Sequence, residues 1–404
     1  MRKASWLLIP VAGILFLATL QPEDARAIPA FARRYKISCT TCHNPFPRLT
    51  PYGEEFAGNG FVIPEEEKDR DYVVAGDPLL RLNRTFPIAV RFDAYGVYED
   101  QKTVDQDLQI PWGLKLLSGG AVAEGIGYYF YFYMSERGEV AGVEDAYIHF
   151  NDIFGSNLDV MVGQFQTSDP LLKRELRLTF EDYRAYTVRI GDSATNLAYD
   201  RGLMLTYGIA STGTDLAGFV VNGNGKAVAD EESRKFDNDK LKNYGFRLLQ
   251  GIGEHVGIGG FVYYGQERQL NNYKNEITNY GPDLHLTVGP LAFSGQYLYR
   301  QDTNPGFDVA AMKIQTDSWL AELIFSPQRD RSRHYFTLLY NLIDSEQDTK
   351  DYETLSFSAT YVLRRNVRLT AEYTRIFKDV KSEGDVFIPV EDANRLVLGL
   401  VSAF

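Results

Sequence analysis

The feature that most constrains the fold of this chain is a period-two alternation of apolar and polar residues, which recurs from Ile88 to Phe404. Runs such as "IAVRFDAYGVY" (88–98), "YFTLLYNLI" (335–343) and "LSFSATYVL" (355–363) put apolar side chains on one face of an extended chain and polar ones on the other. Counting such runs predicts about sixteen strands of roughly 9 to 13 residues, the length at which a tilted strand crosses an outer membrane.

The connections between these strands are alternately short and long through most of this region. Short ones are expected at 118–120, 154–157, 251–254, 289–290 and 364–366, and long polar ones at 166–199, 222–243, 301–313 and 378–392. An up-and-down barrel has short periplasmic turns and long outer loops, whereas a soluble β-sandwich has no reason for this asymmetry. Residues 80–404 are therefore predicted to form a mainly β protein, an up-and-down barrel of about sixteen antiparallel strands in the outer membrane of a Gram-negative bacterium.

The amino-acid composition agrees with a barrel and argues against some kinds of binding partner. The chain has 26 Tyr, 25 Phe and 35 Gly, and its mean hydropathy of −0.26 argues against a bundle of membrane helices. Its formal net charge of −12 argues against nucleic acid as a partner, because phosphates require a basic surface, and is compatible with attracting small cations.

The first residues resemble an export signal in their physical character. Arg2 and Lys3 precede an apolar run at 6–20, and "ARA" at 25–27 offers the small residues that a signal peptidase reads. A membrane anchor is the alternative, but the run is shorter than the roughly 20 residues of a spanning helix. We expect a signal peptide at 1–27, and then a small domain and charged linker at 28–79.

Both cysteines of the chain lie in Cys39-Thr40-Thr41-Cys42-His43, the C-x-x-C-H motif that attaches a c-type haem. Thiols three positions apart on a helical turn reach both vinyl groups of one porphyrin, and the adjacent histidine reaches the iron. A zinc site needs four ligands, a thioredoxin-like pair needs a βαβ unit, and a structural disulfide leaves His43 unexplained. The motif predicts one covalent haem, with Cys39 and Cys42 as thioether residues and His43 as the proximal iron ligand.

A sixth ligand is not evident nearby, because residues 44–85 contain neither His nor Met. The iron is then five-coordinate, or the ligand comes from elsewhere. The candidates are His149 and His285, which alternation places on the lumen face, His255 near the same end of the barrel, and the amine of Ile28. Histidines that merely line a wet pore are the alternative for each, and His334 is expected to face the membrane girdle.

The segment "IPAFARRYKISCTTCHNPFPRLTPYGEEFAGNGF" (28–61) resembles the N-terminal segment of the fused outer-membrane cytochrome–porins. The resemblance lies in "PAFAR", the haem motif, and the residues Pro47, Leu49, Gly53, Phe56 and Gly60. It implies a small helical monohaem domain at the mouth of the barrel. It further implies that four apolar side chains pack against the porphyrin: Phe31, Phe46, Leu49 and Phe56. Lys36 departs from the pattern, since a glycine or small residue is expected there.

Members of that family are best known as iron(II) oxidases. The resemblance and the barrel together predict a conduit that carries electrons from an extracellular donor, a metal ion or mineral such as iron(II), to a periplasmic electron carrier. Acidic outer residues such as Asp344, Glu346 and Asp348 could concentrate cations. The alternatives are a solute channel with a haem-bearing plug and a conduit that runs outward. The sequence leaves open whether the chain is an enzyme, which would be an iron(II):cytochrome c oxidoreductase.

Overall fold

A computed structural model describes residues 30–63, 66, 72–73, 76–77, 82–83, 86–100, 104–226, 228–237, 239–269, 272–383 and 386–404. The expected signal peptide, Ile28 and most of the charged linker lie outside the described residues. None of the helices in these ranges combines the length and the apolar character that a membrane-spanning helix needs.

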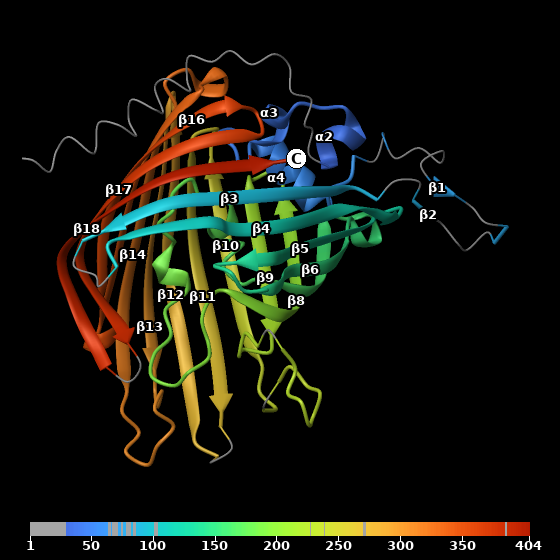
Figure 1. Ribbon diagram of the computed structural model, residues 1–404. Coiled ribbons are helices and arrows are strands. Elements are labelled where there is room, and N and C mark those ends of the chain that lie inside the picture. Colours follow the sequence, from blue (N-terminus) through green and yellow to red (C-terminus); the bar gives the residue numbers. More distant parts are fainter. Residues whose placement is uncertain are drawn as a thin grey trace, which may run out of the picture.

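Sixteen strands of the described chain close into one antiparallel barrel, as the alternation predicts (Figure 1). Their bounds are β3 (Ile88–Glu99), β4 (Gln106–Ala123), β5 (Ile126–Glu136), β6 (Gly142–Phe150), β7 (Leu158–Gln166), β8 (Tyr199–Ile209), β9 (Thr214–Val221), β10 (Asn243–Ile252), β11 (Val256–Arg268), β12 (Lys274–Val288), β13 (Leu291–Asp302), β14 (Ile314–Phe325), β15 (His334–Ser345), β16 (Tyr352–Arg364), β17 (Val367–Glu383) and β18 (Val386–Ala403).

Each strand pairs with the next in sequence, and β18 returns to pair with β3. This seam extends past the strand end, because the backbone N–H and C=O groups of Val90 and Phe404 bond to each other at 2.7 and 2.8 Å. A closed cylinder leaves no unpaired sheet edge, which is the condition for strands in a hydrocarbon environment.

Alternation sorts the side chains between lumen and exterior. On β16, Thr354, Ser356 and Ser358 are fully buried inside, whereas Phe357 between them is 47% exposed. Leu400 and Phe404 at the end of the chain are exposed in the same way. The outer face is therefore apolar and the inner face polar, as in barrels that span a membrane.

Two expected connections are wrong in detail. The glycines at 118–120 lie inside β4, and the turn comes later, at Glu124 and Gly125. A Cβ on Gly119 would approach Phe31 Cζ to 3.0 Å, so this glycine makes room for a packed neighbour rather than a turn. The expected loop at 378–392 is mostly strand, because β17 and β18 continue pairing as far as Glu383 and Val386.

Three short helices lie at the end of the barrel that carries the short turns and the C-terminus, which we call the short-turn end (Figure 1). They are α2 (Ala30–Tyr35), α3 (Cys39–Cys42) and α4 (Pro51–Gly58); residues 30–63, which contain them, are called the helical segment below. Thr50 caps α4 by accepting from the N–H of Gly53 and also donates its hydroxyl to the carbonyl of Thr41 at 2.7 Å. This one side chain therefore starts α4 and ties it to α3. Outside the barrel, β1 (Tyr72–Val73) and β2 (Leu82–Asn83) form a small two-stranded sheet.

Candidate functional site

A cavity of about 210 Å³ lies between the helical segment and the inner wall of the barrel. The helical segment contributes mostly apolar side chains together with both thiols and the imidazole of the C-x-x-C-H motif. The barrel contributes polar and aromatic residues, among them Arg91, Ser118, Tyr129, Tyr131, Asp145 and Tyr147. The cavity is therefore shared between two parts of the chain and is complete only when both are in place.

The two thiols face this cavity from one helical turn. Cys39 and Cys42 are the first and last residues of α3, and both are free thiols. Ser38 caps the helix, its side chain accepting from the N–H of Thr40. Burial raises the pKa of both thiols, so they are protonated at neutral pH. The arrangement offers a pair of thiols on one face, as a doubly attached group requires.

The ring of His43 is oriented by a backbone bond. Its Nδ1 lies 2.8 Å from the carbonyl oxygen of Pro47, which can only accept, so Nδ1 carries the proton and Nε2 keeps its lone pair. Burial lowers the pKa of His43, and the ring is neutral at pH 7. Phe46 packs edge-on against it at 5.0 Å between ring centres. A neutral imidazole with one nitrogen committed and the other available is the form that binds a metal ion.

The apolar wall of the cavity contains all four side chains that the resemblance assigns to it: Phe31, Phe46, Leu49 and Phe56. Phe31 packs edge-on against Phe56 at 5.3 Å and stacks on Phe61 at 5.1 Å. Phe61 in turn stacks on Tyr129 of β5 at 4.6 Å. The aromatic cluster therefore continues from the helical segment into the barrel wall.

The backbone explains why the pattern of the cytochrome–porins has glycine or a small residue at two positions of this segment. A Cβ on Gly53 would lie 2.1 Å from the carbonyl oxygen of Cys42, so α4 can rest on α3 only with glycine there. Lys36 has φ +57°, in the left-handed region that glycine enters without strain. The departure at Lys36 thus occurs where the backbone itself favours the expected glycine.

Polar contacts hold the helical segment in the short-turn end. Arg48 pairs with Glu322 of β14 at 2.6 Å. Asn44 Nδ2 donates to Asp330 at 2.8 Å, in the turn after β14. On the other side, Asn151 in the turn after β6 donates to the carbonyl of Asn59 at 2.7 Å. The segment is bound to opposite walls and not tethered at its ends alone.

The three candidate distal histidines lie in different surroundings. His149 of β6 is 4% exposed, its Nδ1 has no partner among the described residues, and Gly60 lies beside it. His285 of β12 has both ring nitrogens engaged, Nδ1 with Ser294 and Nε2 with Asp283. His255 is exposed in the turn after β10. None of them lines the cavity, and a distal ligand from this set stays a prediction.

The sequence does not reveal that the connection between β7 and β8 enters the lumen. Residues 167–198, called the luminal loop below, contain the 3-10 turns η4 (Arg174–Leu176) and η5 (Arg184–Tyr186). Tyr183 and Tyr186 are fully buried there. The available signal was the number of apolar residues among the charges of this supposed outer loop. Eight of them are buried: Leu171, Leu172, Leu178, Tyr183, Ala185, Tyr186, Ile190 and Leu197.

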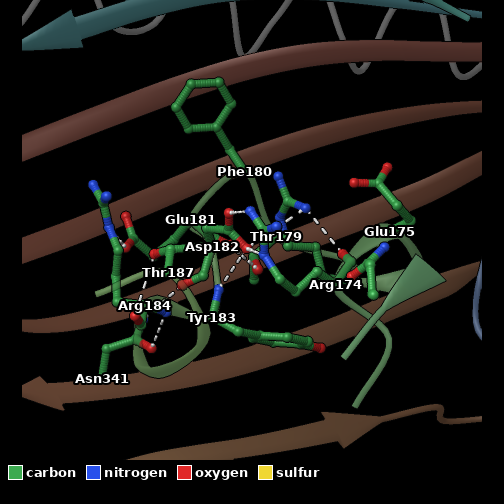
Figure 2. A network of polar contacts seen from close by, with 12 residues as sticks. Arg174, Glu175, Thr179, Phe180, Glu181, Asp182, Tyr183, Arg184, Thr187 and Asn341 are labelled. Carbon is green, nitrogen blue, oxygen red and sulfur yellow. Dashed lines mark hydrogen bonds and ion pairs between the residues drawn. The ribbon is translucent and has the colours of Figure 1, made fainter. Parts of the chain in front are cut away.

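The luminal loop bonds to the far wall of the barrel (Figure 2). Glu372 of β17 accepts from the N–H groups of Phe180 and Glu181 at 2.6 and 2.9 Å. Asn341 of β15 accepts from the N–H of Arg184 at 3.2 Å and donates to the carbonyl of Asp182 at 3.0 Å. The loop therefore crosses the lumen from the β7–β8 side and obstructs it above the cavity.

The arrangement does not suggest a free-standing metal site. Within the described ranges no group of three or more His, Cys, Asp or Glu side chains converges as ion ligands would. The helical segment offers the cavity a pair of thiols, one neutral imidazole and an apolar wall, and the barrel adds charged groups such as Arg91 and Asp145. This set suits a large group with apolar and polar parts rather than a bare ion.

No family model matches this sequence, and no curated protein matches it. Solved structures do match the fold. The anion-selective porin from Comamonas acidovorans is 11% identical, with a TM-score of 0.58 over 79% of this chain and 99% of that one. The outer-membrane channel DcaP of Acinetobacter baumannii is 14% identical, with a TM-score of 0.54 over 79% and 97%.

A third similar structure is OmpF of Salmonella typhi in complex with daunomycin. It is 8% identical, with a TM-score of 0.55 over 79% of this chain and 97% of that one. At such identities the likeness concerns the fold alone. The chain has the closed sixteen-strand architecture of the outer-membrane porins, and this supports an outer-membrane location.

Proposed function

We propose that this chain is an outer-membrane cytochrome–porin that carries electrons from extracellular iron(II) to a periplasmic electron carrier. It would do so through one haem attached to Cys39 and Cys42 with His43 as proximal ligand. The observation that carries the proposal is the cavity itself, which both thiols line and into which the oriented ring of His43 also faces. The short-turn end with the helical segment would face the periplasm.

The residues of the site fit such a group on their own chemistry. Cys39 and Cys42 supply thiols, His43 supplies an unprotonated Nε2, and Phe31 and Phe56 supply flat apolar walls that exclude water. A haem would supply reversible one-electron chemistry at its iron. The surrounding protein would then fix the position of the haem and the dielectric constant of its environment.

The obstructed lumen favours a conduit over an open channel. The helical segment fills the short-turn end and the luminal loop crosses the barrel beyond it. A hydrocarbon band of roughly 25 Å offers no redox centre, so a cofactor inside the barrel shortens the distance that electrons must cross. The conduit needs no water-filled path for solutes.

A row of aromatic rings leads from the cavity toward the end of the barrel opposite the short-turn end. Tyr129 and Tyr131 line the cavity, and Tyr133 follows Tyr131 on the same strand at 5.4 Å between ring centres. Lys115 lies over Tyr133 at 4.2 Å and over Trp112 at 5.7 Å. Closely spaced rings are suitable for electron passage, and this row runs in the direction that the proposal requires.

A solute channel with a haem-bearing plug is the second candidate, because the similar solved structures include porins. It requires an open path around the luminal loop, and the contacts of that loop with β15 and β17 argue against one. An outward-running conduit uses the same geometry and differs only in its donor and acceptor.

A redox titration of the purified protein tests the proposal. The wild type is expected to give a peroxidase-active band on a denaturing gel and to be reduced by iron(II), and the variant Cys39→Ala/Cys42→Ala is expected to give no such band. Liposomes loaded with an internal reductant separate the candidates: external ferric reduction without sugar leakage supports a conduit. A wild-type protein without haem, or one that iron(II) leaves ferric, would overturn the iron oxidase proposal.

A further inference from the structure

A cluster of buried cations lies next to the cavity, on the side of β3, β4 and β17. A small polar cavity there shares Arg91 and Glu175 with the larger one and is lined by the cationic side chains of Arg91, Lys115, Arg177 and Arg368. Lys115 and Arg368 are 2% and 5% exposed. Such a concentration of buried positive charge is costly unless anions compensate it.

The carboxylates nearby compensate it only in part. Asp93 lies 2.8 Å from Arg91 and 3.5 Å from Lys115, and Glu175 lies 3.2 Å from Lys115. Asp182 pairs with Arg174 and lies 3.7 Å from Arg177 (Figure 2). Among the described residues, the five cationic groups Arg91, Lys115, Arg174, Arg177 and Arg368 face the three carboxylates Asp93, Glu175 and Asp182. Within this set the cations outnumber the carboxylates by two.

Two of the arginines have buried nitrogens without a partner. The Nε atoms of Arg177 and Arg368 are buried and form no hydrogen bond with a described residue. Arg368 also forms no ion pair with any described residue, and its Nη1 donates to the carbonyl of Phe46 at 3.3 Å. Phe46 packs on the ring of His43, so the least compensated cation lies beside the haem motif. Buried donors without partners require an explanation, and an anionic group is the simplest.

Acidic residues lie along a different wall of the larger cavity. Asp145 of β6 and Asp169 of the luminal loop line it, and Glu54 lies 3.8 Å from Lys173, which also lines it. β6 is separated from β17 by four strands of the closed sheet, β5, β4, β3 and β18. Arg91 is the member of the cation cluster that lines the larger cavity, and Arg177 and Arg368 line the small cavity that adjoins it there. An anionic edge of a group bound in the larger cavity is therefore directed toward this side, away from Asp145 and Asp169.

We propose that Arg91, Arg177 and Arg368 bind the paired propionate carboxylates of the haem. This inference rests on the proposed function and adds the orientation of the group: its anionic edge faces β3 and β17, and its apolar body faces Phe31 and Phe56. Guanidinium groups bind carboxylates in a bidentate manner, and the two cations in excess within that set balance two carboxylates. The same cations favour the reduced iron, because reduction adds a negative charge next to them.

The test compares Arg368→Gln with Arg368→Lys and with Arg375→Gln. Arg375 lies farther along the same strand and pairs with the exposed Asp392 of β18, away from the cation cluster, so it serves as the matched control. The readouts are haem staining, the midpoint potential, and the propionate bending bands in the resonance Raman spectrum. Arg368→Gln is expected to lower the potential and shift the bands, Arg368→Lys to move both less, and the control to leave both unchanged.

The outcomes separate this inference from the proposed function. A stained Arg368→Gln protein with the potential and bands of the control overturns the inference while the proposed function stands. A wild type without haem overturns both. If Arg368→Gln does not fold, Arg177→Gln in the luminal loop takes its place, since it leaves every barrel strand unaltered, and the same downward shift in potential is expected.

Discussion

Arg48 in the helical segment and Glu322 on β14 are 274 positions apart in sequence, and their side chains meet at 2.6 Å. Glu322 is 1% exposed at its side chain and also accepts from the hydroxyl of Tyr183 at 2.9 Å. One buried carboxylate thus joins the three parts of the molecule: the helical segment, the luminal loop and the barrel wall.

Arg48→Ala is expected to loosen the helical segment. Removing one partner leaves the buried Glu322 carboxylate without its cation, at a cost of about 2–3 kcal/mol, less than for a fully buried pair because Arg48 is 22% exposed. Protease digestion at increasing temperature would detect release of the segment at a lower temperature. Arg331→Ala, at an exposed position in the turn after β14, is the control and should behave like the wild type.

Gly127→Ala is expected to displace the helical segment from β5. The added Cβ would lie 2.5 Å from the carbonyl oxygen of Gly60, a backbone atom that cannot move aside alone. Gly260→Ala on β11 is matched to it, because nothing lies within 4 Å of the Cβ there. Under the proposed function, the haem spectrum of Gly127→Ala should change on mild heating while that of Gly260→Ala does not. Equal behaviour of the two variants would show that the segment does not pack as described.

Under the proposed function, His43→Gln should leave the thioether bonds of the haem intact and remove the proximal ligand of its iron. Loss of the nitrogen that the Pro47 carbonyl orients is expected to shift the visible absorption bands and the midpoint potential. His334→Gln, at an exposed position at the start of β15, should change neither. His149→Gln discriminates between coordination states: a spectral shift indicates that this histidine is the distal ligand. Unaltered bands in His43→Gln would contradict the assignment of the proximal ligand.

When the protein is made without haem, the thiols of Cys39 and Cys42 are expected to react slowly with alkylating agents. Because burial raises the pKa of Cys39 and Cys42, their reactive thiolate fraction at neutral pH is smaller than that of an ordinary cysteine. Alkylation is therefore expected to be slow at pH 7 and to accelerate at higher pH than in a reference protein. That reference is Glu124→Cys in a background without the native cysteines, because Glu124 is exposed in a turn. Equal rates at neutral pH would show that the thiols are not buried.

Glu372→Ala should open the lumen. It removes the acceptor for the N–H groups of Phe180 and Glu181, so the luminal loop loses its bonds to β17. Planar-bilayer conductance is expected to increase several-fold over a low wild-type value. Glu353→Ala is the control, because Glu353 bonds to Tyr340 and not to the loop. A high conductance in the wild type itself would favour the channel candidate.

The barrel could be predicted from sequence because its determinants are local. Alternation marks each strand, and the expected loops at 166–199 and 222–243 match the ends of β7, β8, β9 and β10. The prediction of a turn at 118–120 was wrong because the reason for a glycine there is a contact with a residue far away in the sequence. Gly119 lies against Phe31. A glycine in a sequence can indicate a turn, but it can equally indicate that another part of the chain packs closely against the backbone there.

The sequence was sufficient to predict only the C-x-x-C-H motif of the candidate site and the apolar residues near it. Cys39, Cys42 and His43 form a contiguous motif, and the apolar residues around them follow from the resemblance. Arg91, Arg368 and the luminal loop could not be predicted, because their positions depend on which strand faces which across the closed cylinder. Glu372 and Phe180, for example, are 192 residues apart and meet only after closure.

The seam between β3 and β18 has a consequence for biogenesis. Ala89 of β3 and Ala403 of β18 both line the cavity, so its wall is incomplete until the first and last strands meet. A chain stalled before its final hairpin would have the C-x-x-C-H motif but no enclosed compartment for the cofactor. Under the proposed function, haem binding and closure of the barrel are thereby coupled, and a barrel that fails to close at this seam would lack the visible absorption of the wild type.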